Sequence, residues 1–579
     1  MLESSRKKIL FRLSVLLLSL LLLAVCCTVV FTEYNWLVNR IVTGLQKPGL
    51  ETLVRQKALT ARKYRLIQYL CGAGLLLVPA LAAAVWRKAD IVITALGVVT
   101  DSVVNVFRSV VQVYRQNTRI QNGSIALALL FVFVKSMYYI CTWDLQYDEM
   151  WCYNYLTARP FYFTFFAYNN YPLFELTTHV FKLLPFSMKI NLRLPVLLTG
   201  MLSCSLLYAC LRKYCRSHAA ALGGLLIYAF MPVTTMYMLY ARGVIFESFF
   251  AIAAIFSLYW WMQTGRKNYL VVFSLANALG MYAMPTHVYL WAMLFVLGAV
   301  VCLRRRRNLP PFLLANGGTL LLSCLLYLPV LLGSGLSFVV EATAPRYTYS
   351  QIIPNIPAFV ASYSGYFTGL RAGVVCMAVV ATGYLLNRKE RYERLLLLVV
   401  LALCVFPLFA YVAQRMVVPY RASGFVALAL PLLFAITVQR LEKGIALRLL
   451  YPAILLAAAV LAVVSHRCES LNWSRFRDRE AIRLSNMLMN MGVRNLYDSS
   501  TGSGFFYFYP ALEYYYRMRH KQIDFSVAVP NSIRFHPFRM DDGYDCIICH
   551  TNTSGTYIPT GYKEVYANRV LKYKVLIKN

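Results

Sequence analysis

Residues 143–195 read WDLQYDEMWCYNYLTARPFYFTFFAYNNYPLFELTTHVFKLLPFSMKINLRLP and lie between two apolar segments, each long enough to cross a bilayer. The stretch is polar and aromatic, and it begins with the carboxylates Asp144, Asp148 and Glu149. Most of the chain before residue 466 is apolar, and function concentrates in loops and in ionisable groups near a membrane. We therefore expect the chemistry of this protein to lie in this loop.

The composition indicates a polytopic membrane protein. Of 579 residues, 59% are hydrophobic and 14% are charged, and the mean hydropathy is +0.56, which is outside the range of soluble domains. The net charge of +34 does not point to nucleic acid, because Lys and Arg gather in short clusters between apolar segments, and we expect no nucleic-acid partner. Most of the fifteen cysteines lie in apolar segments and are interpreted as small buried hydrophobes.

Residues 1–122 form an N-terminal membrane extension. A basic start and the apolar run 9–31 predict an uncleaved anchor, and a second span is predicted at 66–86. Residues 33–65 between the two spans carry seven Lys or Arg, which is unusual for an external loop. Residues 90–114 predict an amphipathic helix on the inner membrane surface.

Residues 123–466 predict an all-α transmembrane module. Basic clusters follow every second span, so simple alternation places them in the cytoplasm and places the 143–193 loop and everything after residue 466 outside. The predicted spans are 124–142, 194–211, 219–239, 243–263, 269–284, 287–303, 311–333, 372–387, 395–414, 422–438 and 446–465. The connection 334–371 contains several prolines and is predicted to be a loop without a helix of its own.

Residues 467–579 predict a small external α/β domain. Helical patterns cover 478–491 and 511–519, and strand patterns cover 495–498, 523–528, 544–550, 562–567 and 571–577. Within the third strand, Cys546 to His550 match the haem-attachment pattern C-x-x-C-H. Consecutive isoleucines between the cysteines are typical of a buried strand, and we favour that interpretation.

The Asp148-Glu149 pair has three interpretations when it is taken alone. It is suited to general-base catalysis, to cation binding, or to capping a surface helix. Aromatic residues such as Tyr147 and Trp151 surround it, and they suit both a membrane interface and the apolar faces of sugar rings.

Several short motifs occur in an order that resembles the GT-C superfamily of glycosyltransferases, in the group that includes protein O-mannosyltransferases and lipid A aminoarabinose transferases. The motifs are Tyr147-Asp148-Glu149, Asn170-Tyr171-Pro172-Leu173, Arg193-Leu194-Pro195, Tyr240-Ala241-Arg242-Gly243, Thr286-His287, and Arg415 with Pro419-Tyr420-Arg421. The resemblance covers about residues 124–437. Many relatives carry His-Pro-Pro-Leu or Lys-Pro-Pro-Leu at the second motif, so we expect no metal or phosphate contact from Asn170.

The resemblance implies an enzyme that moves a sugar from a polyprenyl-phosphate donor to a lipid, glycan or protein acceptor at the external face of a bacterial inner membrane. Asp148 would be the general base, and Glu149 would orient the acceptor or help to hold a cation. The residues expected to bind the donor phosphate are Arg242, His287, Arg415 and Arg421; those expected to contact substrate are Tyr147, Trp151, Asn170, Tyr171, Tyr240 and Tyr420. No cofactor follows with certainty, and a divalent metal ion remains open.

A lipid or glycan transporter, or flippase, is the alternative. Such a protein usually carries ionisable residues within its spans and shows repeat symmetry between its halves. Here the charges within the spans are sparse, with Glu247 and Lys135 as the main exceptions. A structural membrane protein would not need the Asp148-Glu149 pair.

The alternation of basic clusters yields a topology prediction. A cysteine introduced near Asn531 should react with an impermeant maleimide added to intact cells, above the background of the native cysteines. A cysteine at Arg305 should react only after the cells are opened. Labelling of position 305 in intact cells would contradict the predicted alternation.

Overall fold

The computed structural model describes most of the chain, including all of the long helices. The described residues are 2–44, 55, 59–165, 171–305, 309–334, 347–387, 391–415, 420, 423–442, 447–470, 473–498, 509–521, 523–527, 543–550, 561–568 and 573–579.

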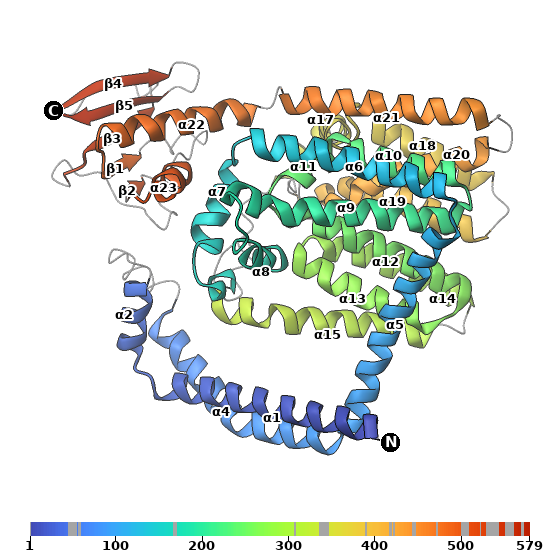
Figure 1. Cartoon of the computed structure of the whole chain (residues 1–579), viewed down its shortest axis with the longest axis horizontal. Coiled ribbons are helices and arrows are strands. Elements are labelled where there is room, and N and C mark those ends of the chain that lie inside the picture. The colour runs from blue at the N-terminus through green and yellow to red at the C-terminus, as the bar shows by residue number, and fades with distance from the viewer. Residues whose placement is uncertain are drawn as a thin grey trace.

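A bundle of roughly parallel and antiparallel helices forms the body of the molecule (Figure 1). Its helices are α6 (Arg119–Thr142), α9 (Met188–Cys215), α10 (His218–Phe230), α11 (Pro232–Leu239), α12 (Val244–Thr264), α13 (Lys267–Ala283), α14 (His287–Arg305), α15 (Leu309–Ser334), α17 (Tyr349–Thr368), α18 (Gly373–Leu386), α19 (Arg391–Gln414), α20 (Ala429–Leu441) and α21 (Leu447–Ser470). Within the described residues, ten helices are long and apolar enough to cross a membrane, or up to twelve if two bent pairs each form one span. The protein is therefore an integral membrane protein, as predicted.

Burial identifies the centre of the bundle. The most apolar window of α12 is 83% buried and that of α9 is 61% buried. Small residues permit close approach at this centre: a side chain at Gly224 of α10 would collide with Leu211 of α9. The site described below lies at one end of these two central helices.

Two connections differ from the sequence prediction. The expected span 219–239 is bent by 63° into α10 and α11, because Pro232 has no backbone N–H to continue the helix. The expected loop 334–371 contains α17, which begins with a capping box at Thr348 and includes Pro354 and Pro357. Prolines are tolerated within membrane helices, so their presence did not exclude a helix here.

The N-terminal extension forms a separate hairpin. It consists of α1 (Leu2–Phe31), α2 (Tyr34–Gly44) and α4 (Ala61–Arg87), followed by α5 (Ala89–Gln116). The Lys8 ammonium lies 2.6 Å from Asp90 at one end of the hairpin, and the Tyr64 hydroxyl donates to the carbonyl of Thr32 at the other (2.7 Å). In the view of Figure 1 the hairpin lies below the bundle and is joined to it by α5, which crosses the bundle obliquely.

A five-stranded sheet forms most of the C-terminal part, with strand order β2-β1-β3-β5-β4. Its elements are α22 (Trp473–Asn490), β1 (Asn495–Asp498), α23 (Tyr509–Met518), β2 (Asp524–Val527), β3 (Cys546–His550), β4 (Tyr562–Asn568) and β5 (Tyr573–Lys578). The central strands β1 and β3 are parallel, whereas β3 and β5 are antiparallel. Residues 546–550 thus form a ladder strand, as the strand interpretation predicts.

This sheet domain packs on the loop that carries the candidate site. The Asn154 amide donates to the carbonyl of Pro510 (2.8 Å), and the rings of Tyr153 and Tyr514 meet edge to face with centroids 5.3 Å apart. The segment that carries Asp148 is therefore supported by the bundle and by the sheet domain.

Candidate functional site

The predicted loop between α6 and α9 is largely helical. It contains α7 (Tyr147–Cys152), the π-helix η3 (Tyr153–Thr157), the 3-10 helix η4 (Phe161–Phe165) and α8 (Pro172–Phe181). Gln146 caps α7, and its backbone N–H donates to the Glu149 carboxylate (2.7 Å). Asp148 and Glu149 thus occupy the first turn of a helix, where negative charge is favourable.

Glu149 points inward and forms a buried ion pair with Arg193 of α9. The guanidinium donates through Nε to Oε1 (2.9 Å) and through Nη2 to Oε2 (2.7 Å). Both side chains are 1% exposed, so they are held away from water in a bidentate geometry. We call this pair the buried clamp.

The buried clamp joins three parts of the chain. Arg193 also donates to the carbonyls of Trp143 and Asp144 at the end of α6 (2.8 and 2.7 Å). The backbone N–H of Ala241, in the turn between α11 and α12, donates to Glu149 Oε1 (2.8 Å). A fully hydrogen-bonded pair of this kind fixes geometry, and it leaves Glu149 placed to position its neighbour rather than to meet a substrate.

Asp148 lies at the mouth of the site and pairs with Arg242. Its Oδ1 is 2.9 Å from Arg242 Nη2, with Asp148 29% exposed and Arg242 11% exposed. Arg242 Nη1 donates to the hydroxyl of the buried Tyr171 (3.1 Å). Burial disfavours the charged guanidinium, but Tyr171 and Asp148 raise the pKa of Arg242 above its ordinary value. Asp148, Tyr171 and Arg242 together form the carboxylate cluster.

The backbone next to Arg242 is fixed by close packing at Gly243. A Cβ at this position would lie 2.4 Å from the carbonyl oxygen of Ala283 and 2.9 Å from the Tyr171 Cβ. Only glycine fits between these groups without displacing the backbone. The Arg-Gly pair of the turn therefore places Arg242 and Tyr171 against each other.

Glu175 of α8 is a second buried carboxyl near the cluster. It is fully buried, and its Oε2 accepts from the Thr157 hydroxyl (3.3 Å). Burial raises the pKa of Glu175 to about 8, although Thr157, Cys152 and Arg242 oppose this rise. At neutral pH Glu175 is mostly protonated, so Asp148 is the carboxylate that balances Arg242.

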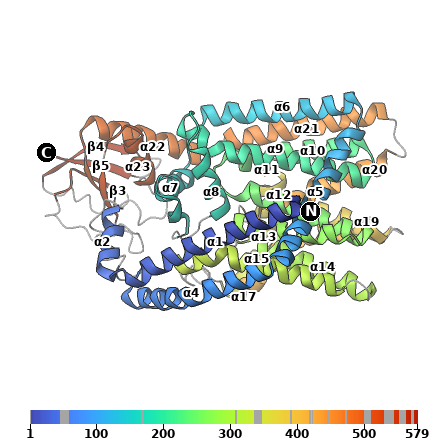
Figure 2. The ribbon, with the colours of Figure 1, turned by 60° about the horizontal axis from the view of Figure 1, so that its bottom comes forward.

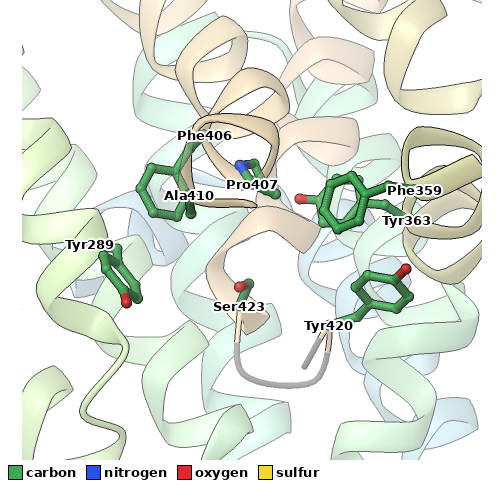
Figure 3. Close-up of a pocket in the computed structure, with 8 residues that line it drawn as sticks. All are labelled: Tyr289, Phe359, Tyr363, Phe406, Pro407, Ala410, Tyr420 and Ser423. Atoms are coloured by element: carbon green, nitrogen blue, oxygen red, sulfur yellow. The ribbon is translucent and has the colours of Figure 1, made fainter. Parts of the chain in front are cut away.

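A small aromatic hollow opens elsewhere in the bundle. Figure 3 shows Tyr289 and Phe406 facing Phe359 and Tyr363 across it, with Ser423 between them. The full lining is Tyr289, Phe359, Tyr363, Phe406, Pro407, Ala410, Tyr420 and Ser423. It is lined mostly by aromatic and other apolar groups. Among the described residues, the buried hydroxyl of Tyr363 has no hydrogen-bond partner.

Helix α11 connects the carboxylate cluster to the aromatic hollow. Arg242 follows α11 directly, and Tyr237 within α11 lies with its hydroxyl 3.4 Å from that of Tyr366 in α17. The ring of Tyr366 packs against Tyr420 of the hollow, with centroids 5.6 Å apart. A displacement of the residues that line the hollow would therefore be transmitted through these contacts to the turn that carries Arg242.

The other residues that were predicted to contact substrate are not members of the carboxylate cluster. Tyr147 and Trp151 lie on α7, where Trp151 packs on Tyr155 (5.2 Å). Tyr240 packs in the cluster around Trp143 and Leu239. Tyr420 lines the aromatic hollow.

The predicted phosphate ligands are not all gathered in the carboxylate cluster. His287 is buried against Gly280 of α13, and within the described residues its ring nitrogens have no partner. Arg415 is exposed with a left-handed φ of 55°, and its guanidinium lies over the ring of Tyr349 (5.7 Å). Asn170 and Arg421 lie outside the described residues.

Sequence reasoning does not single out Glu175, Tyr363 or the clamp role of Arg193. Glu175 offered one signal, since it is an acid between the apolar residues Phe174 and Leu176. In the described part of the chain, no group of three or more His, Cys, Asp or Glu is arranged to hold a metal ion.

The fold defines the class of protein before any relative is considered: a polytopic helix bundle whose first long loop carries a carboxylate site. No protein-family model and no curated protein sequence matches this chain. Solved protein structures, in contrast, match this chain. ArnT from Cupriavidus metallidurans bound to undecaprenyl phosphate matches with a TM-score of 0.54 at 12% identity, covering 78% of this chain and 98% of that chain.

The apo structure of the same ArnT matches with a TM-score of 0.53 at 12% identity, covering 79% of this chain and 98% of that chain. Arabinosyltransferase EmbB from Mycobacterium smegmatis matches more weakly, with a TM-score of 0.35 at 15% identity over 56% of this chain and 30% of that chain. The similarity to ArnT confirms the predicted GT-C-type fold.

The buried clamp should dominate the stability of the loop. Glu149→Gln keeps the shape of the side chain but leaves Arg193 buried without its anion, which typically costs about 3–5 kcal/mol. Thermal unfolding in one detergent should show a large drop in Tm. Asp90→Asn is the control, because its ion pair with Lys8 (2.6 Å) is exposed and should contribute at most about 1 kcal/mol. Equal shifts for the two variants would contradict a special role for the clamp.

Glu175 should make stability depend on pH. Its pKa is about 8 in the folded protein against an ordinary value of 4.5. The folded state therefore holds the proton more firmly, and the free energy of unfolding should fall as pH rises from about 4.5 to 8. Glu175→Gln mimics the protonated form, so its Tm should decrease less between pH 5 and pH 8.5 than that of the wild type. Glu564→Gln, at an exposed position, is the control, and identical pH profiles for Glu175→Gln and wild type would refute the assignment.

Proposed function

We propose that this protein is a membrane glycosyltransferase that moves a sugar from a polyprenyl-phosphate donor to an acceptor hydroxyl. The ion pair between Asp148 and Arg242 carries the proposal, because it places a partly exposed carboxylate and a fork-shaped cation at one mouth of the bundle. ArnT, whose fold this chain shares, has been crystallised with undecaprenyl phosphate. The predicted topology would place this mouth outside a bacterial inner membrane, on the periplasmic side.

The reaction needs a base and an anion-stabilising group. The acceptor oxygen attacks C1 of the sugar, and Asp148 takes the hydroxyl proton as the new C1–O bond forms. The bond between C1 and the phosphate oxygen breaks, and the polyprenyl phosphate leaves with the electron pair. Arg242 stabilises the charge that develops on the phosphate, since a guanidinium binds phosphate through two parallel donors.

The pairing of Asp148 with Arg242 gives the donor a role in activating the base. When the donor phosphate binds Arg242, it competes with Asp148 for the same N–H groups. Asp148 is then released from its counter-ion and is available to the acceptor proton. Glu149 stays in the buried clamp and keeps α7 and the Arg242 turn at a fixed separation.

The aromatic hollow suits an apolar part of the donor. Its lining is mostly aromatic and apolar, which suits the hydrocarbon of an isoprenoid chain. The free hydroxyl of Tyr363 could contact a polar group of the ligand. His287, Arg415 and Arg421 remain candidate phosphate ligands within this proposal.

The contacts of the two ionisable residues within the spans give little support to the alternative that the protein is a transporter. The carboxylate of Glu247 within α12 is fully buried and accepts from the backbone N–H of Gly424 (3.1 Å). Lys135 of α6 lies 5.8 and 5.6 Å from the ring centroids of Tyr139 and Phe230. Both contacts tie helices to their neighbours, which is a structural role.

The test is transfer from a polyprenyl-phosphate sugar by purified variants of matched monodispersity. Asp148→Asn preserves shape but removes the proton acceptor, so turnover should fall by a factor of about 10²–10⁴. Asp144→Asn is the matched control, because Asp144 contributes only its backbone carbonyl to the clamp, and it should have a mild effect. Near wild-type turnover by Asp148→Asn would remove Asp148 as the base, and loss of turnover by Asp144→Asn alone would shift the site by one turn.

A further inference from the structure

The free end of the N-terminal hairpin carries a cluster of positive charge that the transferase proposal does not use. The hairpin-end surface consists of Arg40 on α2, Arg55, and Arg62, Lys63 and Arg65 on the first turn of α4. Between residues 32 and 65, Glu33 is the one acid among the described residues. The side chains of Arg40, Arg62 and Arg65 are exposed to solvent.

The hairpin fixes the level of this surface relative to a bilayer. Its span Lys8–Phe31 has 24 residues and its span Ala61–Arg87 has 27, with no residue of either most apolar window buried inside the protein. Helices of this length cross about 30 Å of hydrocarbon. The described residues that join the two spans, 32–44, 55 and 59–60, therefore lie where the hydrocarbon ends, at the depth of the lipid head groups.

Two further contacts fix this end of the hairpin. The Tyr34 hydroxyl donates to the carbonyl of Leu59 (2.8 Å), next to the bond from Tyr64 to Thr32. The Arg40 guanidinium lies 5.4 Å from the centre of the half-exposed Trp36 ring. A Trp beside an Arg at the end of a span is typical of an interfacial anchor.

The surface lies at the same end of the molecule as Asp148. Figures 1 and 2 both show α2 at the end that carries α7 and the C-terminal sheet, whereas Lys8 and Asp90 lie at the opposite end of the hairpin. The basic clusters Arg266-Lys267 and Arg304 lie at the ends of bundle helices remote from α7. Positive charge is normally sparse on the external side of a membrane protein, so the exposed Arg40, Arg62 and Arg65 are an unusual feature of this end of the molecule.

We propose that the hairpin-end surface binds the phosphate head groups of anionic lipids in the leaflet on the Asp148 side. Arginine fits phosphate through its fork of donors, and each basic residue at the membrane surface contributes attraction for anionic lipid. The apolar flanks of α1 and α4 accommodate the tails of the same lipids. The proposal is independent of the transferase chemistry, since none of its residues belongs to the carboxylate cluster.

The experiment uses the full chain in nanodiscs of phosphatidylcholine that contain a trace of lipid with a photoactivatable diazirine. Two probes are compared, one with a phosphatidylglycerol head group and one with a phosphatidylcholine head group. Cross-linked peptides are quantified by mass spectrometry. In the wild type, peptides from residues 32–66 should carry severalfold more of the glycerol probe than of the choline probe.

Triple substitution Arg40→Gln, Arg62→Gln and Arg65→Gln should lower this preference on the order of tenfold. The matched control removes the same charge from exposed positions of the sheet domain, Arg519→Gln, Lys563→Gln and Lys578→Gln, and should keep the preference. In the wild type, raising the salt to about 0.5 M should weaken the preference, and this measurement does not depend on any variant folding.

Equal labelling of the wild-type hairpin by both probes would overturn the proposal. Loss of the preference in both triple variants would also overturn it, because the effect would then follow net charge and not this surface. None of these outcomes depends on sugar transfer.

Discussion

The bidentate pair of Glu149 and Arg193 is the interaction on which the rest of the site depends. It is buried on all sides, and it gathers the end of α6, the start of α7, helix α9 and the turn before α12 around one ion pair. A charge pair in such a place is stable only when each of its lone pairs and N–H groups is satisfied. This pair fixes the backbone next to Asp148 and Arg242, which therefore face each other and form an ion pair of their own. The Asp148–Arg242 pair is not required to hold the loop in place.

The division of labour between Asp148 and Glu149 illustrates how adjacent residues of one type take opposite roles. Successive side chains on a helix point about 100° apart, so one carboxylate faces the protein and the other faces the opening. The inward carboxylate makes hydrogen bonds with Arg193, Ala241 and Gln146. The outward one is 29% exposed and forms an ion pair with Arg242.

Much of the fold could be predicted from the sequence because its signals are local. Apolar runs of membrane length predicted the bundle, and alternating short segments predicted each of the five strands, including β3 across Cys546 and Cys549. The prediction failed at Pro354 and Pro357, where proline was taken as a sign of a loop although α17 contains both. Of the predicted site residues, Asp148, Tyr171 and Arg242 are in contact in the structure. The partnership of Glu149 with Arg193 and the burial of Glu175 depend on tertiary packing, and no local pattern encodes them. The aromatic hollow could not be predicted for the same reason. Tyr289 and Phe359 have no sequence context that distinguishes them from other aromatic residues of membrane helices, and only the packing of the helices brings them to one hollow.

The contacts of the loop span very different distances along the chain, and this sets an order of assembly on the ribosome. Glu149 bonds to Arg193 44 residues later and to the backbone of Ala241 92 residues later. Asn154 bonds to Pro510, 356 residues later. During insertion the acid of α7 is therefore unpaired until α8 and the first turns of α9 have been made, and the π-helix lacks its Pro510 contact until most of the chain has been made. Domains form in the order in which they are made, so this protein completes the loop between α6 and α9 last, and a ribosome that stops before residue 510 leaves behind a membrane-inserted bundle without the support of its sheet domain.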